Sequence, residues 1–409
     1  MATVTLHKLC RICGSTKLTP VLDLGSMPLA NAFLTKKELN RPEASFPLVV
    51  QFCDRCSLLS LRHTVDPSTL FRGYHYVTAA SFPLVAHFKE EARMILERFI
   101  TRKDQLIVEF GSNDGVLLSE LKSACRVLGV DPARIVGKFA QERGVETIQA
   151  FFGERTAARI KKGYGKADIL IANNVFAHID DLHDTMRGVE GLLADDGVFI
   201  SESHWVGNLI GDGGFDQIYH EHLSYYSLHA LQALASLHGL IITEAQLIPI
   251  HGVSMRVFMR KKGRPKASVT TLLAREKRLG LTTIRAFRAF GKRVLKNKTA
   301  AAKLLRRLAS FGATIVGYGA PAKGNTLLNY FGIGPDILSC ITDTTSLKQG
   351  LFTPGTHIPV VSPHILTKQP PEYLLLLAWN YADAILKKEQ KLREQGVKFI
   401  IPVPTVSVV

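Results

Sequence analysis

The sequence predicts an α/β protein with three parts: a small cysteine-rich module, a mostly parallel sheet covered by helices, and a second, smaller α/β domain. Four of the six cysteines precede residue 70. From residue 105, short apolar runs alternate with helical patterns, which is typical of a parallel sheet with crossover helices. A second such series begins at Thr314, with strands expected at Ile315–Gly317, Leu338–Thr342, Tyr373–Ala378 and Phe399–Ile401.

Length and composition permit this organisation. The chain has 409 residues, of which 46% are hydrophobic, and this is enough for two or three domains with their own cores. No apolar run approaches the roughly 18 residues of a membrane-spanning helix. Residues 1–13 contain no apolar stretch of signal-peptide type. We therefore expect a cytoplasmic protein without a membrane span, with domains at 1–70, 71–263 and 264–409.

The middle domain is predicted in most detail. A helix begins near Ser81 and places its apolar side chains on one face. The expected strands are Leu106–Phe110, Val127–Asp131, Ile148–Phe152, Ile169–Asn173 and Val198–Glu202. The expected helices between them are Leu117–Ala124, Arg134–Arg143, Ala157–Lys162 and Leu182–Leu193. Two later apolar runs are suited to an antiparallel hairpin that completes the sheet, Leu240–Thr243 and Met255–Met259.

Positive charge is concentrated in one segment. The formal net charge is +16, and residues 256–307 contain 18 lysines or arginines and one acidic residue, Glu276. A helical pattern runs through most of it, over Ser268–Phe311. Such a stretch can face an anionic ligand, RNA or a lipid surface, or it is a solvated helix face. The sequence leaves both interpretations open.

The cysteine spacing predicts a metal site. Two residues separate Cys10 from Cys13, and two separate Cys53 from Cys56, so each pair can direct both thiolates at one ion. Four thiolates satisfy tetrahedral zinc and leave no open position, which is typical of a structural site. Disulfides are the alternative, and they are uncommon in a cytoplasmic chain.

The turn after the first strand of the middle domain predicts a cofactor. Residues 109–115 read Glu-Phe-Gly-Ser-Asn-Asp-Gly, and such glycines let backbone N–H groups approach a ligand at a helix start. Dinucleotide dehydrogenases share a glycine-rich turn, so an NAD domain is the alternative. The acidic-x-Gly-x-x-x-Gly spacing instead matches the Rossmann-like domain of class I methyltransferases, which bind S-adenosylmethionine (SAM).

Further cofactor contacts are expected at the ends of the following strands. Asp131, before Pro132, suits the two ribose hydroxyls of either cofactor. Phe152 ends the third expected strand and is expected to border the adenine, while Asn174 follows the fourth and is expected to meet the methionine end. The predicted SAM-binding residues are Glu109, Gly111, Asn113, Gly115, Asp131, Pro132, Phe152 and Asn174.

The densest group of titratable side chains follows the fifth strand, at residues 215–226. Ligands of an open parallel sheet bind beyond the carboxyl ends of its strands, so this loop is expected beside the cofactor. It offers imidazoles for proton transfer near neutral pH, a carboxylate to orient one of them, and phenols to donate hydrogen bonds to a developing oxyanion. Metal binding by His220 and His222, or ordinary core packing, are the alternatives.

Over essentially the whole chain, these motifs resemble the sugar C-methyltransferases that methylate C3 of nucleotide-linked 4-keto-deoxysugars. That family has an N-terminal zinc-binding domain and a C-terminal Rossmann-like domain. The shared motifs are the paired cysteines, Leu22–Gly25, Tyr74-x-Tyr76, the loop 109–115, Asn174-x-x-x-His178, Phe215–His222, Val316–Lys323, Gly332–Asp336, Asp343–Thr345 and Thr353–Pro359.

The resemblance implies a chemistry. His222 would remove the C3 proton as general base, and Glu221 would orient it. Tyr219 or Tyr76 would donate to the C4 enolate oxygen, and His178 would contact the same region.

The resemblance also implies the partners. The substrate would be a dTDP- or GDP-linked 4-keto-deoxysugar, no nucleic acid is expected as a partner, and zinc would take no part in the reaction. Because three domains lie within one chain, a monomer is expected. The Gly317-x-Gly319 loop of the C-terminal domain also looks like a nucleotide fold. The domain would either bind a cofactor there or, as a remnant Rossmann domain, pack on the active site and contact the sugar nucleotide, with Lys323 at the helix start meeting a phosphate.

An RNA methyltransferase with a zinc module is the main alternative, because basic helices and class I domains also combine in those enzymes. An amino-directed enzyme of that kind usually carries Asn/Asp-Pro-Pro-aromatic at the fourth strand, where this chain has Asn173–Phe176. A C5-directed enzyme needs a nucleophilic cysteine near the cofactor, and Cys125 is expected at the opposite end of the sheet. An inactive scaffold would have lost the loop glycines, which are intact.

Overall fold

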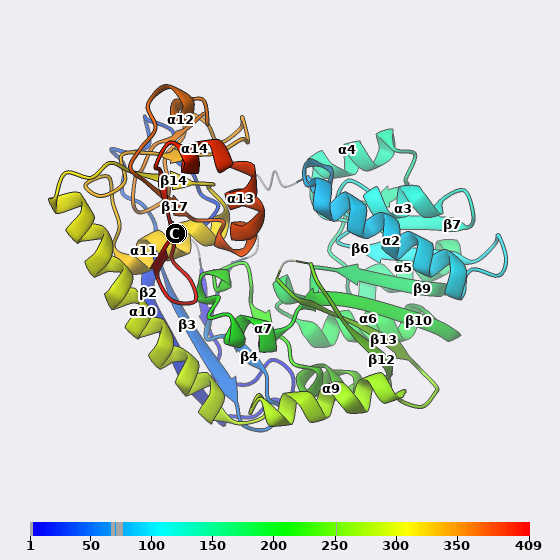
Figure 1. The fold of residues 1–409 in the computed structure, drawn as a ribbon. Coiled ribbons are helices and arrows are strands. Elements are labelled where there is room, and N and C mark those ends of the chain that lie inside the picture. Colours follow the sequence, from blue (N-terminus) through cyan, green and yellow to red (C-terminus); the bar gives the residue numbers. More distant parts are fainter. Residues whose placement is uncertain (1–2, 67–69, 71–76, 251) are drawn as a thin grey trace.

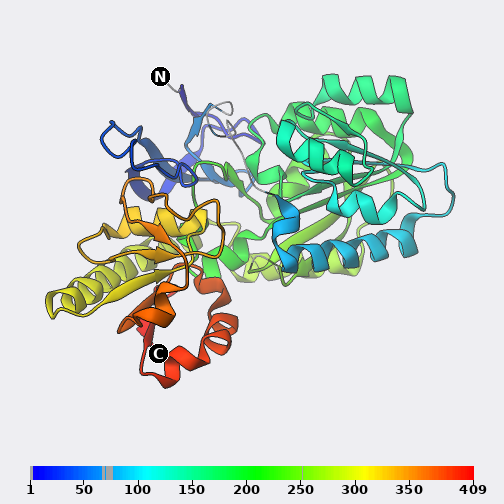
Figure 2. The ribbon, with the colours of Figure 1, turned by 90° about the horizontal axis from the view of Figure 1, so that it is seen from above.

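A computed structural model describes residues 3–66, 70, 77–250 and 252–409. The helices and strands gather into two bodies (Figures 1 and 2). One holds the large sheet of the middle domain, and the other combines the N-terminal strands with the C-terminal sheet. None of the described helices is both long and apolar enough to cross a membrane.

The middle domain is a seven-stranded sheet in the order β12-β13-β10-β9-β6-β7-β8. Its central strands are parallel, and β13 is inserted antiparallel to both β10 and β12. Every strand predicted for this sheet is present, and the predicted hairpin closes it. The last edge strand, β8, is shorter than predicted. The strands are β6 (Leu106–Phe110), β7 (Arg126–Val130), β8 (Thr147–Ile148), β9 (Ala167–Asn173), β10 (Leu193–His204), β12 (Ile241–Ile248) and β13 (Ser254–Arg260).

Helices cover both faces of this sheet (Figure 1). The predicted helix near Ser81 is α2, which buries Leu84, Phe88 and Ile95 along one side. The helices are α2 (Phe82–Phe99), α3 (Val116–Leu121), α4 (Arg134–Glu142), α5 (Glu154–Tyr164), α6 (Leu182–Leu192), α7 (Val206–Gly211) and α8 (Leu228–Leu237), with 3-10 turns η1 (Thr78–Ala80), η2 (Phe176–His178) and η3 (Phe215–Gln217).

The N-terminal sheet contains a strand from the middle of the chain. Its order is β11-β4-β3-β2, and β11 lies just after the titratable cluster, with Tyr225 opposite Leu59. This pairing joins the cysteine-rich module to the loop expected to react. The strands are β2 (Leu18–Met27), β3 (Phe46–Cys53), β4 (Leu59–Leu61) and β11 (Ser224–Tyr225), with a separate ribbon of β1 (Val4–Leu6) and β5 (His63–Val65).

The C-terminal sheet has the order β16-β15-β14-β17-β18-β19 and is parallel except for β19. This matches the predicted second α/β domain. The strands are β14 (Ile315–Tyr318), β15 (Ile341–Thr342), β16 (Val360–Val361), β17 (Tyr373–Leu376), β18 (Lys398–Ile401) and β19 (Ser407–Val408). The helices are α11 (Ala322–Phe331), α12 (Ile365–Lys368), α13 (Ala382–Lys388) and α14 (Gln390–Glu394), with the 3-10 turn η4 (Trp379–Tyr381).

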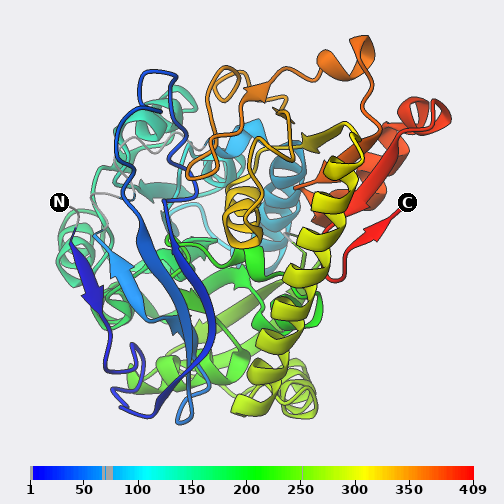
Figure 3. The same cartoon turned by 90° about the vertical axis from the view of Figure 1, so that its left-hand side faces the viewer.

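The basic segment forms two helices, α9 (Ala267–Arg278) and α10 (Ile284–Ser310). One side of α10 buries Phe287, Phe290 and Val294, and the helix lies along β2 (Figure 3). The approach is close, because a Cβ at Gly291 would lie 2.4 Å from the Val21 carbonyl oxygen. Most basic side chains of α10 are exposed, as expected of a solvated face. Helix α9 packs on α8 and β12, which belong to the middle domain. The domain boundary at residue 263 therefore stays a prediction.

Candidate active site

The cofactor loop leaves the end of β6 and turns sharply. Gly111 has φ +68°, and a Cβ there would lie 2.7 Å from Cγ2 of Val175, so only glycine fits at this crossing. Asn113 also has positive φ, at +49°, and Gly115 precedes α3 with φ +72°. The side chain of Asn113 accepts a hydrogen bond from the backbone N–H of Thr78 at 3.0 Å, which ties the loop to η1.

Asp131 lies beside this loop, at the end of β7. One carboxylate oxygen accepts from the backbone N–H of Asn113 at 3.0 Å, and the other accepts from that of Ala133 at 2.9 Å. Each oxygen can accept a second hydrogen bond, so the carboxylate retains capacity for ribose hydroxyls. Pro132 follows it and is partly exposed.

Buried acceptor atoms at this sheet edge fit a cationic ligand. Among the described residues, hydrogen-bond partners are lacking for Glu109 Oε2, Asp114 Oδ1, Asn173 Oδ1 and Asn174 Oδ1. Burial, the main cause, and neighbouring carboxylates hold the pKa of Glu109 well above its usual range. Buried acceptors without partners are costly. An ammonium can donate hydrogen bonds to them, and the carboxylates among them also attract a sulfonium charge. The methionine end of SAM carries both groups, so the residues present fit this cofactor.

The ring of Phe152 already contacts another ring of the protein. Its ring stacks on that of Phe110, with centroids 4.2 Å apart and planes 6° from parallel. One face of Phe152 is therefore covered by the protein, and the predicted contact with adenine would use the rest of the ring. Its neighbour Phe151 is 62% exposed.

The titratable cluster centres on His222. The hydroxyl of Tyr219 lies 2.8 Å from Nε2 of His222, and Nδ1 lies 2.8 Å from the carbonyl oxygen of Gln217. Because a carbonyl only accepts, Nδ1 carries the proton in the neutral ring, and Nε2 presents its lone pair to the tyrosine. This arrangement suits a base that takes a proton at Nε2.

Glu221 does not orient His222 in the way predicted. Its carboxylate accepts a hydrogen bond from Nδ2 of Asn31 at 2.7 Å, while the contact with Nδ1 of His222 is made by Gln217. The chain turns at this point, so adjacent side chains meet different neighbours. Burial raises the pKa of Glu221 to about 7, against the effect of the Asn31 hydrogen bond.

Two more histidines flank the cluster. The ring of His178 lies 5.0 Å from that of His222, and its Nδ1 lies 2.7 Å from the Glu221 carbonyl oxygen. Burial lowers the pKa of His178. His204, at the end of β10, has its ring 5.5 Å from that of His222. The prediction omitted His204, although its position at a strand end beside the cluster was a usable signal.

Three further residues were named for this site, Tyr76, His220 and Lys323. Tyr76 lies outside the described residues. His220, named above only as a possible metal ligand, is buried with Nε2 3.1 Å from the Phe46 carbonyl oxygen. Lys323 meets protein groups rather than solvent: its Nζ lies 3.8 Å from Asp216 and 4.1 Å above the Trp379 ring. This contact links the C-terminal domain to the reactive loop.

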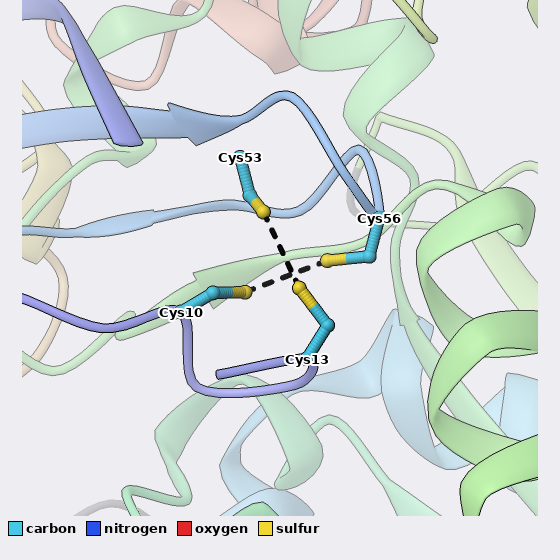
Figure 4. Close-up of side chains that lie close together, drawn as sticks. All are labelled: Cys10, Cys13, Cys53 and Cys56. Atoms are coloured by element: carbon cyan, nitrogen blue, oxygen red, sulfur yellow. Dashed lines mark hydrogen bonds between the residues drawn. The ribbon is translucent and has the colours of Figure 1, made fainter. Parts of the chain in front are cut away.

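The four cysteines converge on one point (Figure 4). Sγ atoms are 3.4 Å apart between Cys10 and Cys56, and 3.5 Å apart between Cys13 and Cys53. Zinc–sulfur bonds of about 2.3 Å in a tetrahedron place sulfur atoms about 3.8 Å apart, whereas a disulfide needs about 2.05 Å. The geometry fits zinc and excludes disulfides within this group.

Comparison with known proteins assigns the family. Three family models match: a putative zinc binding domain over residues 10–71, a methyltransferase domain over 85–245, and a C-methyltransferase C-terminal domain over 249–404. The chain is 38% identical to the C-methyltransferase NovU of Streptomyces niveus over 97% of its own length and 95% of NovU. The chain belongs to the SAM-dependent sugar C-methyltransferase family. It is therefore a SAM-dependent C-methyltransferase with a structural zinc, and the NAD interpretation is set aside.

Solved structures match part of the chain. Magnesium protoporphyrin IX methyltransferase from Synechocystis PCC 6803, with bound SAM, is 14% identical with a TM-score of 0.33, over 44% of this chain and 82% of that one. The PH0226 protein of Pyrococcus horikoshii OT3 is 14% identical with a TM-score of 0.36, over 47% and 99%.

Proposed function

We propose that this enzyme transfers a methyl group from SAM to C3 of a nucleotide-linked 4-keto-deoxysugar. The observation that carries the proposal is the contact between Tyr219 and His222, with the imidazole tautomer set by Gln217. A C3 hydrogen beside a C4 ketone is acidic, so a base and an oxyanion donor suffice to make a carbon nucleophile. Membership of a sugar C-methyltransferase family supports this substrate class.

In the proposed reaction, Nε2 of His222 takes the C3 proton. The electron pair of the broken C–H bond forms the C3–C4 double bond of an enolate, and the C4 oxygen becomes negative. The hydroxyl of Tyr219 turns from His222 to donate to that oxygen, with Tyr76 as the second expected donor. When bound, SAM supplies the methyl group that C3 takes, and S-adenosylhomocysteine is left.

Glu221 has a charge role in this scheme. An ionised Glu221 favours the imidazolium that His222 becomes after taking the proton. Asn31 favours the ionised form by donating to the carboxylate. His178 is expected to contact the sugar near C4, because its ring lies beside that of His222.

Hydrogen exchange tests the proposal directly. The enzyme is incubated in D2O with S-adenosylhomocysteine and dTDP- or GDP-linked 4-keto-deoxysugars, and C3 deuteration is followed by NMR. We expect enzyme-dependent exchange that His222→Gln abolishes. With SAM instead, mass spectrometry and NMR should locate a new carbon-bound methyl group at C3. Methylation of oxygen or of RNA, or exchange that persists in His222→Gln, would contradict the proposal.

A further inference from the structure

A buried ionic cluster lies where α2 crosses the large sheet. Arg256, on β13, donates to Oε2 of Glu202 on β10 from both Nε, at 3.1 Å, and Nη2, at 2.7 Å. His87, on α2, places Nε2 2.9 Å from Oε1 of Glu202. The carboxylate of Glu91, also on α2, lies 3.4 Å from Arg256 Nη2. The arginine charge is thus mainly matched by Glu202.

Glu91 is buried and one of its carboxylate oxygens can still accept a hydrogen bond. It is 1% exposed, and its Oε2 accepts from Nδ2 of Asn173 at 2.8 Å. Its Oε1 has no hydrogen-bond partner in the part of the chain that the structure describes, and neither does Asn173 Oδ1. Asn173 ends β9, the strand that pairs with β6, which carries Glu109. The unmet atoms therefore lie at the edge where the cofactor loop begins.

The balance of charge here favours a cation. Glu109 also has an unmet buried oxygen, Oε2. After burial, Glu91 is the strongest influence that raises the pKa of Glu109, so the two carboxylates act on one another. A third carboxylate, Glu202, accompanies them, whereas Arg256 is the one permanently cationic group in contact with Glu91 and Glu202 among the described residues. An added ammonium supplies both charge and N–H donors.

We propose that Glu91 binds the α-ammonium group of the methionine part of SAM, together with Glu109. The ammonium is a donor-only cation, and the unmet oxygens of Glu91, Glu109 and Asn173 are acceptors. Helix α2 thereby becomes part of the cofactor site, although it precedes the cofactor loop in sequence. This assignment does not depend on the identity of the methyl acceptor.

A divalent metal is the other cation that this cluster could attract. Ligand atoms of His87, Glu91 and Glu202 lie within 4.8 Å of one another. However, the guanidinium of Arg256 contacts both carboxylates. A second, divalent charge beside that guanidinium is repelled, so the geometry favours the ammonium.

Calorimetric titration of the full-length enzyme with two ligands tests the assignment. S-adenosylhomocysteine has the ammonium, and 5′-methylthioadenosine lacks the whole amino-acid part. Glu91→Gln keeps the side-chain shape and an acceptor for Asn173 but removes the charge. We expect about tenfold weaker S-adenosylhomocysteine binding, the effect of losing one charge-assisted hydrogen bond, and unchanged methylthioadenosine binding. Glu90→Gln, on the exposed side of α2, is the matched control and should change neither.

The opposing results are distinct. If folded Glu91→Gln loses the same affinity for both ligands, Glu91 has only a structural role. If its affinity for S-adenosylhomocysteine is unchanged, Glu91 is not part of the cofactor site. A second metal ion per chain, found by elemental analysis and absent from Glu91→Gln, would replace the proposal with a metal site. If Glu91→Gln does not fold, Glu91→Asp keeps the charge but shortens the reach. This variant should again weaken only the binding of S-adenosylhomocysteine, and a wild-type affinity for that ligand would overturn the proposal.

Discussion

Tyr219 and His222 face one another across a single loop, with the tyrosine hydroxyl 2.8 Å from Nε2 of the imidazole. The Gln217 carbonyl oxygen lies 2.8 Å from Nδ1 on the other side of the ring. Six consecutive positions thus contain the proposed base, the group that sets its tautomer and the proposed oxyanion donor. The base is oriented by its own loop, and β11 immediately after it fastens that loop to the N-terminal sheet.

Replacing the proposed base should strongly lower turnover without weakening cofactor binding. We expect His222→Gln to lower kcat by about 10²–10⁴, the usual contribution of general base catalysis, because no other group takes the C3 proton. Tyr219→Phe should lower kcat by about tenfold, because one oxyanion hydrogen bond is lost. Methyl transfer and S-adenosylhomocysteine titration measure the two properties. His364→Gln, at an exposed position, is the control, and near-normal kcat in His222→Gln would refute the base assignment.

Asn31 should govern the pH dependence of turnover. Its hydrogen bond to Glu221 lowers a pKa that burial raises to about 7. Asn31→Ala removes this stabilisation of the ionised form, so the Glu221 pKa rises further. If the ionised form supports His222, the acidic limb of the kcat profile should move to higher pH, by up to about one unit. Asn40→Ala, at an exposed position, is the control and should leave the pH profile unchanged. If the acidic limb of the profile does not move in Asn31→Ala, Glu221 does not support catalysis.

Removing zinc should disable catalysis through the fold. The cysteine site closes the module whose sheet holds β11. Cys53→Ser should leave the protein without bound zinc, lower its Tm and reduce kcat, while the affinity for S-adenosylhomocysteine stays within about twofold because the cofactor loop lies on another sheet. Elemental analysis should find one zinc in the wild-type chain and in Cys340→Ala, whose thiol is not among the four. Full activity without zinc would contradict the structural coupling.

Glu276, the acidic residue of the basic segment, should be a stability residue. Its carboxylate is fully buried on α9 and accepts from the Trp205 indole at 2.8 Å, from the backbone N–H groups of Leu228 and His229 at 2.6 and 3.1 Å, and from the His229 ring at 2.6 Å. Glu276→Ala leaves these buried donors without an acceptor, which should lower the unfolding free energy by about 2–4 kcal/mol. Urea unfolding followed by tryptophan fluorescence measures this. The exposed Lys277→Ala should lose less than about 0.5 kcal/mol, and an equal loss in both variants would contradict the role.

Local patterns carried much of the prediction. A short apolar run predicts the strand Leu106–Phe110, and apolar side chains spaced along one face predict the helix after Ser81. The cysteine pairs and the cofactor loop are short motifs whose geometry depends on a few neighbouring residues. One strand end was predicted wrongly: β8 ends at Ile148 rather than Phe152, because its partner β7 ends at Val130, which lies opposite Ile148.

The sequence by itself determined the class of cofactor domain, the zinc ligands and the histidine loop, since each is written in consecutive or closely spaced residues. Tertiary structure alone decided the partners of those residues. Asn31 reaches Glu221 across 190 positions, Glu91 reaches Asn173 across 82, and Phe152 stacks on Phe110. Residue spacing sets the face on which a side chain lies, but contacts between distant segments arise only when those faces pack together.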